Sequence, residues 1–187
     1  MMNEKRFERM ERWGVLICFA LAVLVHFMYQ WSGYSIWAGI IGAANESLWE
    51  HGKILILPYG LWSIVEFAAA KPSFKRFIVA KTAALYAMLA AMIVFYYLYT
   101  FFTGESIVVV DIISTLAWMV LGFVVSSALM RCPKADAWFT VAVFALVLMV
   151  VMLLSFTVNP PQVGLFQDPV TGGFGLFANT VPTMIPV

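Results

Sequence analysis

Charge is scarce in this 187-residue sequence: only 11% of the residues are Asp, Glu, Lys or Arg, whereas 63% are hydrophobic. Soluble domains carry roughly 25% charged residues, so a protein surrounded by water on all sides is excluded. The few charges also balance, because 11 basic and 10 acidic residues give a formal net charge of +1. We expect no nucleic acid as a partner, since anionic lipids are sufficient partners for the basic side of the protein.

Cysteine and histidine are equally rare, with two of each in the chain. Cys18 and Cys132 fall in the half of the protein that we predict to face the cytoplasm, where thiols stay reduced, so a structural disulfide is not expected. No His-x-x-x-His or Cys-x-x-Cys spacing occurs. Any metal site must therefore be assembled from residues on separate elements.

Long apolar runs are what the sequence has in abundance. A helix needs about 20 apolar residues to cross a bilayer, because all its backbone hydrogen bonds must be made within the segment. The first run is longer than the roughly 7 to 15 residues of a signal-peptide core, so we expect it to be retained as a helix. We predict an all-α fold, a polytopic transmembrane helical bundle of about five spans within a single domain of residues 1–187, with spans near 13–31, 46–70, 77–102, 107–130 and 137–158.

The basic residues fall almost entirely on one side of these spans. Ten of the eleven share a side, and Lys53 is the exception; the ten are Lys5, Arg6, Arg9, Arg12, Lys71, Lys75, Arg76, Lys81, Arg131 and Lys134. The positive-inside rule then predicts a cytoplasmic N-terminus and an extracytoplasmic C-terminus in the plasma (inner) membrane. The lipid bilayer is the expected partner, with anionic inner-leaflet lipids facing the basic side.

Two segments interrupt the pattern of spans on the predicted outer side. Residues 32–44 (SGYSIWAGIIGAA) are rich in Gly, Ala and aromatic residues and too short to span, so we expect an interfacial or re-entrant segment. Residues 159–187 contain several prolines and glycines, which forbid regular helix and favour turns. We expect them to form an outer C-terminal segment.

The most unusual stretch is Asn45–Lys53 (NESLWEHGK), directly before the second apolar run. Ser47 and Glu50 fit the Ser-x-x-Glu capping box, which is a purely structural interpretation. Capping needs one carboxylate and no imidazole, however, so Glu46 and His51 remain unexplained. Ser47 as a nucleophile with His51 as its base is the alternative for the i, i+4 pair, but a capping hydroxyl is favoured.

Two further ionisable residues lie inside predicted spans, where charge is costly unless it is paired. His26 is about one turn from the outer end of the first span, and Asp111 about one turn into the fourth. Both share a depth with the Glu50–His51 turn. We therefore predict a divalent-metal site from His26, Glu50, His51 and Asp111, an N2O2 set that suits Zn²⁺ or Fe²⁺.

An outward-open pocket around such a metal would support hydrolysis or binding of a lipid or small molecule. In this hypothesis Glu50 and His51 are the catalytic residues, with Glu50 as a ligand or general base. The remaining polar residues would bind the ligand at the rim or, in the case of Asp168, cover the pocket as a lid or form an Asx-type turn: Asn45, Glu46, Ser47, Lys53 and Asp168.

Other functions remain open from the sequence. Carboxylates beside a re-entrant segment also suit a small transporter or an ion- or proton-coupled carrier, although no inverted repeat is visible. A haem held between His26 and His51 is a further alternative that nothing else favours. A structural subunit of a membrane complex would need none of this chemistry, so whether the chain is an enzyme stays undecided.

Asn-Glu-Ser-Leu-Trp-Glu-His at 45–51 and PPQVGLFQDPVTGGFG at 160–175 carry a family resemblance. With them the chain resembles a family of small prokaryotic polytopic membrane proteins of unknown function. Its members share an Asn-Glu-Ser-x-Trp-Glu-His motif and a Pro-Pro, Asp-Pro-x-Thr-Gly segment after the last span. The resemblance implies a shared architecture and adds weight to Asn45, Glu46, Glu50, His51 and Asp168. The patterns of rhomboids, signal peptidases, lipid phosphatases and ceramidases are absent.

Overall fold

The computed structural model describes residues 4–176, which contain five helices long and apolar enough to cross a membrane. The long helices are α1 (Glu4–Trp31), α3 (Leu48–Ala70), α4 (Phe74–Thr103), α5 (Val108–Met130) and α6 (Phe139–Val158). Two short helices lie between them, α2 (Ile36–Ile41) and η1 (Pro133–Trp138), and η2 (Gly164–Phe166) follows α6. The predicted all-α bundle of five spans is confirmed, and the chain is a multi-pass membrane protein. Part of the predicted outer segment, 177–187, lies outside the described residues.

The first helix begins earlier than hydropathy predicted. It starts at Glu4 rather than near residue 13 because its first turns are amphipathic, with Phe7 and Glu11 buried among exposed charges. Hydropathy detects only the continuously apolar part of such a helix. The other predicted boundaries agree with the observed helices to within a few residues.

Successive spans run in opposite directions, so the bundle has two chemically different ends. Ion pairs join distant segments at the first end, including Lys81 to Glu11 and Arg76 to Asp136. We call the end that contains residues 4–12, 66–82 and 126–138 the basic end. The opposite end, with residues 26–53, 99–111 and 157–176, is called the acidic end; it carries one Lys and no Arg.

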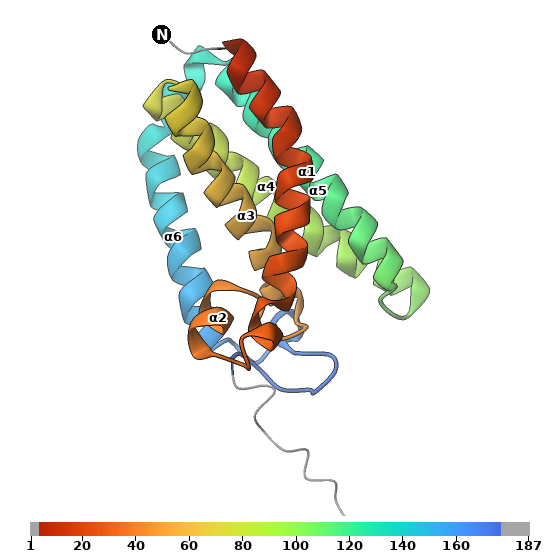
Figure 1. Cartoon of the computed structure of the whole chain (residues 1–187). Coiled ribbons are helices and arrows are strands. Elements are labelled where there is room, and N and C mark those ends of the chain that lie inside the picture. Colours follow the sequence, from red (N-terminus) through yellow and green to blue (C-terminus); the bar gives the residue numbers. More distant parts are fainter. Residues whose placement is uncertain (1–3, 177–187) are drawn as a thin grey trace, which may run out of the picture.

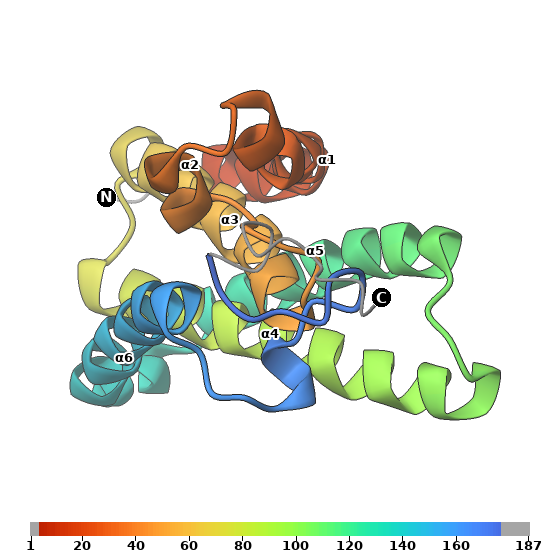
Figure 2. The ribbon, with the colours of Figure 1, turned by 90° about the horizontal axis from the view of Figure 1, so that it is seen from below.

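α4 is the central helix of the bundle. It packs against α3, α5 and α6. Of the residues in its most apolar stretch 56% are buried, compared with 17% in the corresponding stretches of α5 and of the span that contains α6. The last two helices therefore lie at the periphery and expose apolar side chains where lipid would be. Figure 2 shows the same arrangement along the bundle, with α1 and α6 on opposite sides of α3 and α4.

The acidic end is closed by α2 and the C-terminal segment, which meet below the long helices (Figure 1). The Tyr29 hydroxyl donates to the Leu176 carbonyl at 3.2 Å, and the Leu176 amide donates to the Thr157 carbonyl at 2.7 Å. α2 forms the segment predicted to be interfacial or re-entrant. It is one short helix across the end of the bundle, and Trp37 is 76% exposed.

Gly14 brings α1 into close contact with its two neighbours. A Cβ atom there would lie 2.4 Å from Trp62 Nε1 and 2.5 Å from Phe123 Cζ, so Ala cannot enter without moving two aromatic rings. We expect Gly14→Ala to lower the free energy of unfolding by about 1–3 kcal/mol. Gly60→Ala is the control, because nothing lies within 4 Å of its Cβ position. A comparison of thermal unfolding midpoints in detergent tests this, and equal midpoints would contradict it.

Candidate metal site at the acidic end

The start of α3 is set by two side chains acting as caps. Ser47 is the N-cap, and its hydroxyl accepts a hydrogen bond from the Glu50 amide at 3.3 Å. The Asn45 side-chain oxygen accepts from the Ser47 amide at 2.8 Å. Glu46 therefore lies in the turn before the helix rather than on its first turn. Its carboxylate is free to fold back along the helix toward His51.

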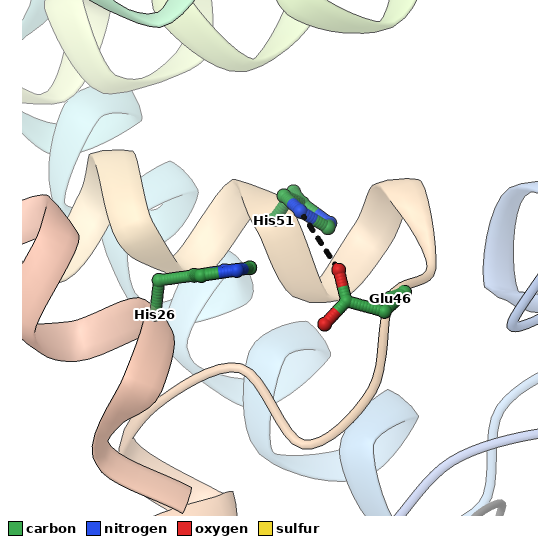
Figure 3. Close-up of side chains that lie close together, drawn as sticks. All are labelled: His26, Glu46 and His51. Atoms are coloured by element: carbon green, nitrogen blue, oxygen red, sulfur yellow. Dashed lines mark ion pairs between the residues drawn. The ribbon is translucent and has the colours of Figure 1, made fainter. Parts of the chain in front are cut away.

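Three potential metal ligands meet at this point. One donor atom from each of His26, Glu46 and His51 lies within 4.8 Å of the others. His51 Nε2 is 3.5 Å from Glu46 Oε2, and the two imidazole centroids are 5.2 Å apart. In Figure 3 the ring of His26 extends from α1 toward the gap between Glu46 and the first turn of α3, where His51 lies.

The backbone determines which nitrogen of His51 faces its neighbours. His51 Nδ1 is 2.9 Å from the Ser47 carbonyl oxygen. A carbonyl can only accept, so Nδ1 carries the hydrogen in this contact. In a neutral ring the lone pair is then on Nε2, directed at the Glu46 carboxylate. A metal ion between these two electron-rich atoms would make their contact attractive.

His26 supplies the second imidazole from a different helix. It is partly buried, and its Nδ1 atom is buried without a hydrogen-bond partner within residues 4–176. Buried ring nitrogens normally have a partner. His51, in turn, is oriented by the hydrogen bond from its Nδ1–H to a backbone carbonyl, which is the usual way in which a metal-binding histidine is held. The two imidazoles and one carboxylate thus form a chemically coherent ligand set.

A cavity of about 460 Å³ borders these ligands. His26 and Glu46 line it, together with polar residues from α1 and from the two segments that close the acidic end. Its other lining residues are Tyr29, Gln30, Tyr34, Ala43, Ala44, Asn45, Asp168 and Val170. A volume of this size accommodates a small polar molecule next to His26 and Glu46.

Glu50 and Lys53 form a separate buried network. Glu50 Oε2 accepts from Lys53 Nζ and from the Ala44 amide, each at 2.8 Å, and Oε1 accepts from the Thr157 hydroxyl at 3.0 Å. Lys53 Nζ also donates to the Gly39 and Gly42 carbonyls, at 3.0 and 3.2 Å. This network ties α2, α3 and α6 together, and both oxygens of Glu50 are occupied within it.

Asp111 lies in another part of the acidic end. Its carboxylate accepts a hydrogen bond from the Tyr99 hydroxyl, which links α4 to α5. Ser114 and Thr115 follow Asp111 on the same face of α5, and their hydroxyls donate to its backbone carbonyl. Figures 1 and 2 both show the α4–α5 turn away from α2. The structure therefore does not bring Asp111 to the imidazoles.

Asn45 and Asp168 organise the C-terminal segment over the cavity. The Asn45 side-chain amide donates to the Gly175 carbonyl at 2.9 Å. The Asp168 carboxylate accepts from the Val170 amide at 2.9 Å and the Thr171 hydroxyl at 2.7 Å, as in an Asx-type turn. Both residues also line the cavity. Asp168 thus combines features of the two roles considered from the sequence, a turn former and part of a cover.

The assembled group differs from the predicted set of four ligands. His26 and His51 are together as predicted, but the nearby carboxylate belongs to Glu46, which the sequence analysis assigned to the rim. The difference arises because the predicted span began at residue 46, whereas α3 begins at Leu48. The Ser-x-x-Glu capping signal already identified Ser47 as the N-cap and placed Glu46 outside the helix, so it contained the information needed.

Comparison with known proteins identifies one family. The profile of a family described as one of unknown function, DUF6512, matches residues 2–176, which is nearly the whole chain. No curated protein and no solved structure matches the chain.

Proposed function

The chain belongs to the DUF6512 family, whose function is unknown, and we propose that it holds one divalent metal ion on His26, Glu46 and His51. The contact between His51 Nε2 and Glu46 Oε2 carries the proposal. Metal–ligand bonds of about 2.1 Å in a tetrahedral zinc site hold neighbouring donors about 3.4 Å apart. His51 Nε2 and Glu46 Oε2 are 3.5 Å apart without an ion, which is close to this spacing.

Two histidines and one carboxylate leave one coordination position of a tetrahedral ion open. Catalytic zinc sites have this composition, whereas structural zinc sites use four protein ligands. The same three donors also suit Fe²⁺. Because His26 and Glu46 line the 460 Å³ cavity, an ion held by them would be accessible from it. A bound water or a small molecule would occupy that position as the fourth ligand.

The chemistry that follows is Lewis-acid binding of a small molecule or lipid headgroup at the acidic end, with hydrolysis through a metal-activated water as the reaction. This end faces the extracytoplasmic side if the positive-inside prediction holds. Glu50 is not part of the metal's ligand set in this proposal, because its two oxygens are already engaged. The carrier and haem alternatives gain no separate support, since the two rings lie close enough to share one small ion.

Metal binding by the purified protein tests the proposal. We expect about one Zn²⁺ or Fe²⁺ per chain, with affinity at least tenfold weaker, about 1.4 kcal/mol, in His51→Ala or Glu46→Gln, because each removes a ligand. Glu105→Gln is the matched control, an exposed carboxylate at the same end. Elemental analysis and competitive titration with a chelator provide the measurement. Wild-type protein that stays free of metal would show that Glu46 and protonated His51 form an ordinary ion pair.

A further inference from the structure

A second cavity, of about 380 Å³, opens between α1 and α5 at the basic end. It is distinct from the metal site, which lies at the other end of α1. Its walls are one stripe of α1, spaced at residues 8, 11, 12 and 15, and one stripe of α5 from Val120 to Arg131. The two helices pack against each other, so the cavity is a groove on the side of the bundle rather than a hole through it.

The groove changes from polar to apolar along the helix axes. Glu8, Arg12 and Arg131 line the part nearest the end of the bundle. Val15, Val120 and Val124 line the part toward its middle, and the last two are 44% and 59% exposed. This gradient matches an amphiphile that lies parallel to the helices. Its charged group would be level with the helix ends and its hydrocarbon chain would lie along the valines.

The charges of the groove indicate the sign of that headgroup. Arg131 is paired with Glu8 across the rim, at 3.0 Å, and this pair is neutral. Glu11 belongs to a buried cluster in which Lys81, 2.7 Å from Glu11, also pairs with Glu66. This cluster carries a formal charge of −1, but Glu11 makes no ion pair or hydrogen bond with Arg12, so it supplies no direct ion pair to the rim of the groove. Arg12, by contrast, makes no ion pair or hydrogen bond with any residue from 4 to 176. One guanidinium without a counter-ion therefore remains at the polar end of the groove.

We propose that this groove binds one anionic phospholipid, with its phosphate on Arg12 and one acyl chain along Val15, Val120 and Val124. A guanidinium binds a phosphate through parallel N–H donors, which makes Arg the suited residue at this position. The single negative charge of a phosphatidylglycerol headgroup neutralises the single unpaired cation. The inner leaflet supplies such lipids at the side to which the basic end is assigned by its charge.

The experiment measures lipid binding to the full chain in detergent, by native mass spectrometry and by the thermal unfolding midpoint. We expect phosphatidylglycerol to bind and to raise the midpoint, and Arg12→Gln to weaken its binding about fivefold, the effect of one basic residue at a membrane surface. Arg9→Gln is the matched control, because Arg9 is exposed on the same helix but does not line the groove. Both residues are exposed, so neither variant should affect folding.

Four results would overturn the proposal. Equal weakening by Arg9→Gln and Arg12→Gln would mean diffuse attraction to the basic end. An equal effect of phosphatidylcholine would mean that the anionic charge is not recognised. An equal midpoint shift with glycerol phosphate, which has no acyl chain, would mean a phosphate site without a lipid. Retained phosphatidylglycerol selectivity in Val124→Asn would likewise argue against an acyl chain in the groove.

Discussion

Replacing Lys81 with Met is expected to be the most destabilising single substitution in the basic half of the protein. Lys81 Nζ lies 2.7 Å from Glu11 Oε1 and also pairs with Glu66, and all three side chains are buried. Removing one partner from a buried ion pair costs about 3–5 kcal/mol, because the remaining charge is left uncompensated. Here the loss leaves two carboxylates that face no cation.

The surroundings of Lys81 make this cost difficult to avoid. Its ammonium group lies within 6 Å of four aromatic rings, those of Phe7, Tyr59, Phe77 and Phe123. Such rings stabilise a cation through their faces, but the faces donate no hydrogen bonds to a carboxylate. Only Tyr59 carries a hydroxyl, and it donates to the Gly122 carbonyl at 3.4 Å. Glu11 lines the groove between α1 and α5, whereas Glu66 is fully buried, so Glu66 gains no new partner from the space that the ammonium leaves.

Removing one acid should have a much smaller effect than removing the lysine. The cluster holds two carboxyl groups and one ammonium, so its formal charge is −1 when all three are ionised. Glu66→Gln makes the cluster neutral. The Gln side chain keeps an oxygen that can accept the hydrogen bond that Trp62 Nε1 donates to Glu66 in the wild type, at 3.0 Å. We expect this variant to change stability by no more than about 1 kcal/mol. Glu11→Gln should cost more, because Glu11 also accepts from Ser126 and Ser127.

A mutant cycle in detergent tests this account of charge balance. The thermal unfolding midpoint should fall most for Lys81→Met, least for Glu66→Gln, and to an intermediate value for the double variant, which leaves Glu11 as the only charge. Lys75→Met is the matched control, because Lys75 is exposed on the same helix. If Glu66→Gln and Lys81→Met proved equally destabilising, the contacts of Glu66 and not the charge balance would be what stabilises this site.

The number and type of the spans could be predicted from the sequence because hydrocarbon leaves no other solution. A long and mainly apolar run such as 107–130, with one charged residue, must form a helix in a bilayer, and α5 occupies Val108–Met130. The same reasoning could not extend α1 back to Glu4. The first turns of this helix are amphipathic, so they are stabilised by packing of one face and are not apolar enough to be recognised by hydropathy. Lateral arrangement, with α4 in the centre, also depends on packing that hydropathy does not encode.

The candidate site was predictable in part. A shared depth below one surface brought His26 and His51 together correctly, but depth is only one coordinate. Asp111 has a similar depth and is bonded to Tyr99, away from the imidazoles. Which acid faces which imidazole depends on lateral position and on where the helix cap falls. Those two properties favour Glu46 over both predicted acids.

The Glu11–Glu66–Lys81 cluster was not identified from the sequence as a site. A signal was present, since Glu66 and Lys81 both lie in or beside apolar runs, where unpaired charge is costly. Lys81 was instead assigned with the other basic residues to the predicted inner surface. Only the antiparallel packing of α1, α3 and α4 shows that the three side chains lie in the interior and balance one another.

The largest expected effect at the acidic end is that of Glu50→Ala. Glu50 and Lys53 are 1% and 2% exposed, and the carboxylate alone connects the Ala44 amide, Lys53 and Thr157. Its removal leaves a buried ammonium with only two carbonyl partners. We expect a loss of about 3–5 kcal/mol. Thr157→Val removes one neutral donor and should cost about 1 kcal/mol.

A double substitution separates this structural role from the catalytic role predicted for Glu50. Glu50→Gln with Lys53→Met removes both charges together, so its unfolding midpoint should lie above that of either single variant. Metal affinity should then remain within about threefold of wild type, roughly 0.6 kcal/mol, because His26, Glu46 and His51 are unchanged. The measurements are the thermal midpoint and the chelator titration used for the metal site.

The two readouts respond to different physical causes. A ligand or general base at position 50 would lose its function in the double variant even when folding is restored, because Gln neither binds a metal as an anion nor accepts a proton at neutral pH. Restored stability with tenfold weaker metal binding would therefore show that Glu50 is a metal ligand. Restored stability with unchanged metal binding would mean that the Glu50–Lys53 pair has a structural role and holds α2, α3 and α6 in place. The carboxylate of Glu46 would then be the one that serves the metal site with the two imidazoles.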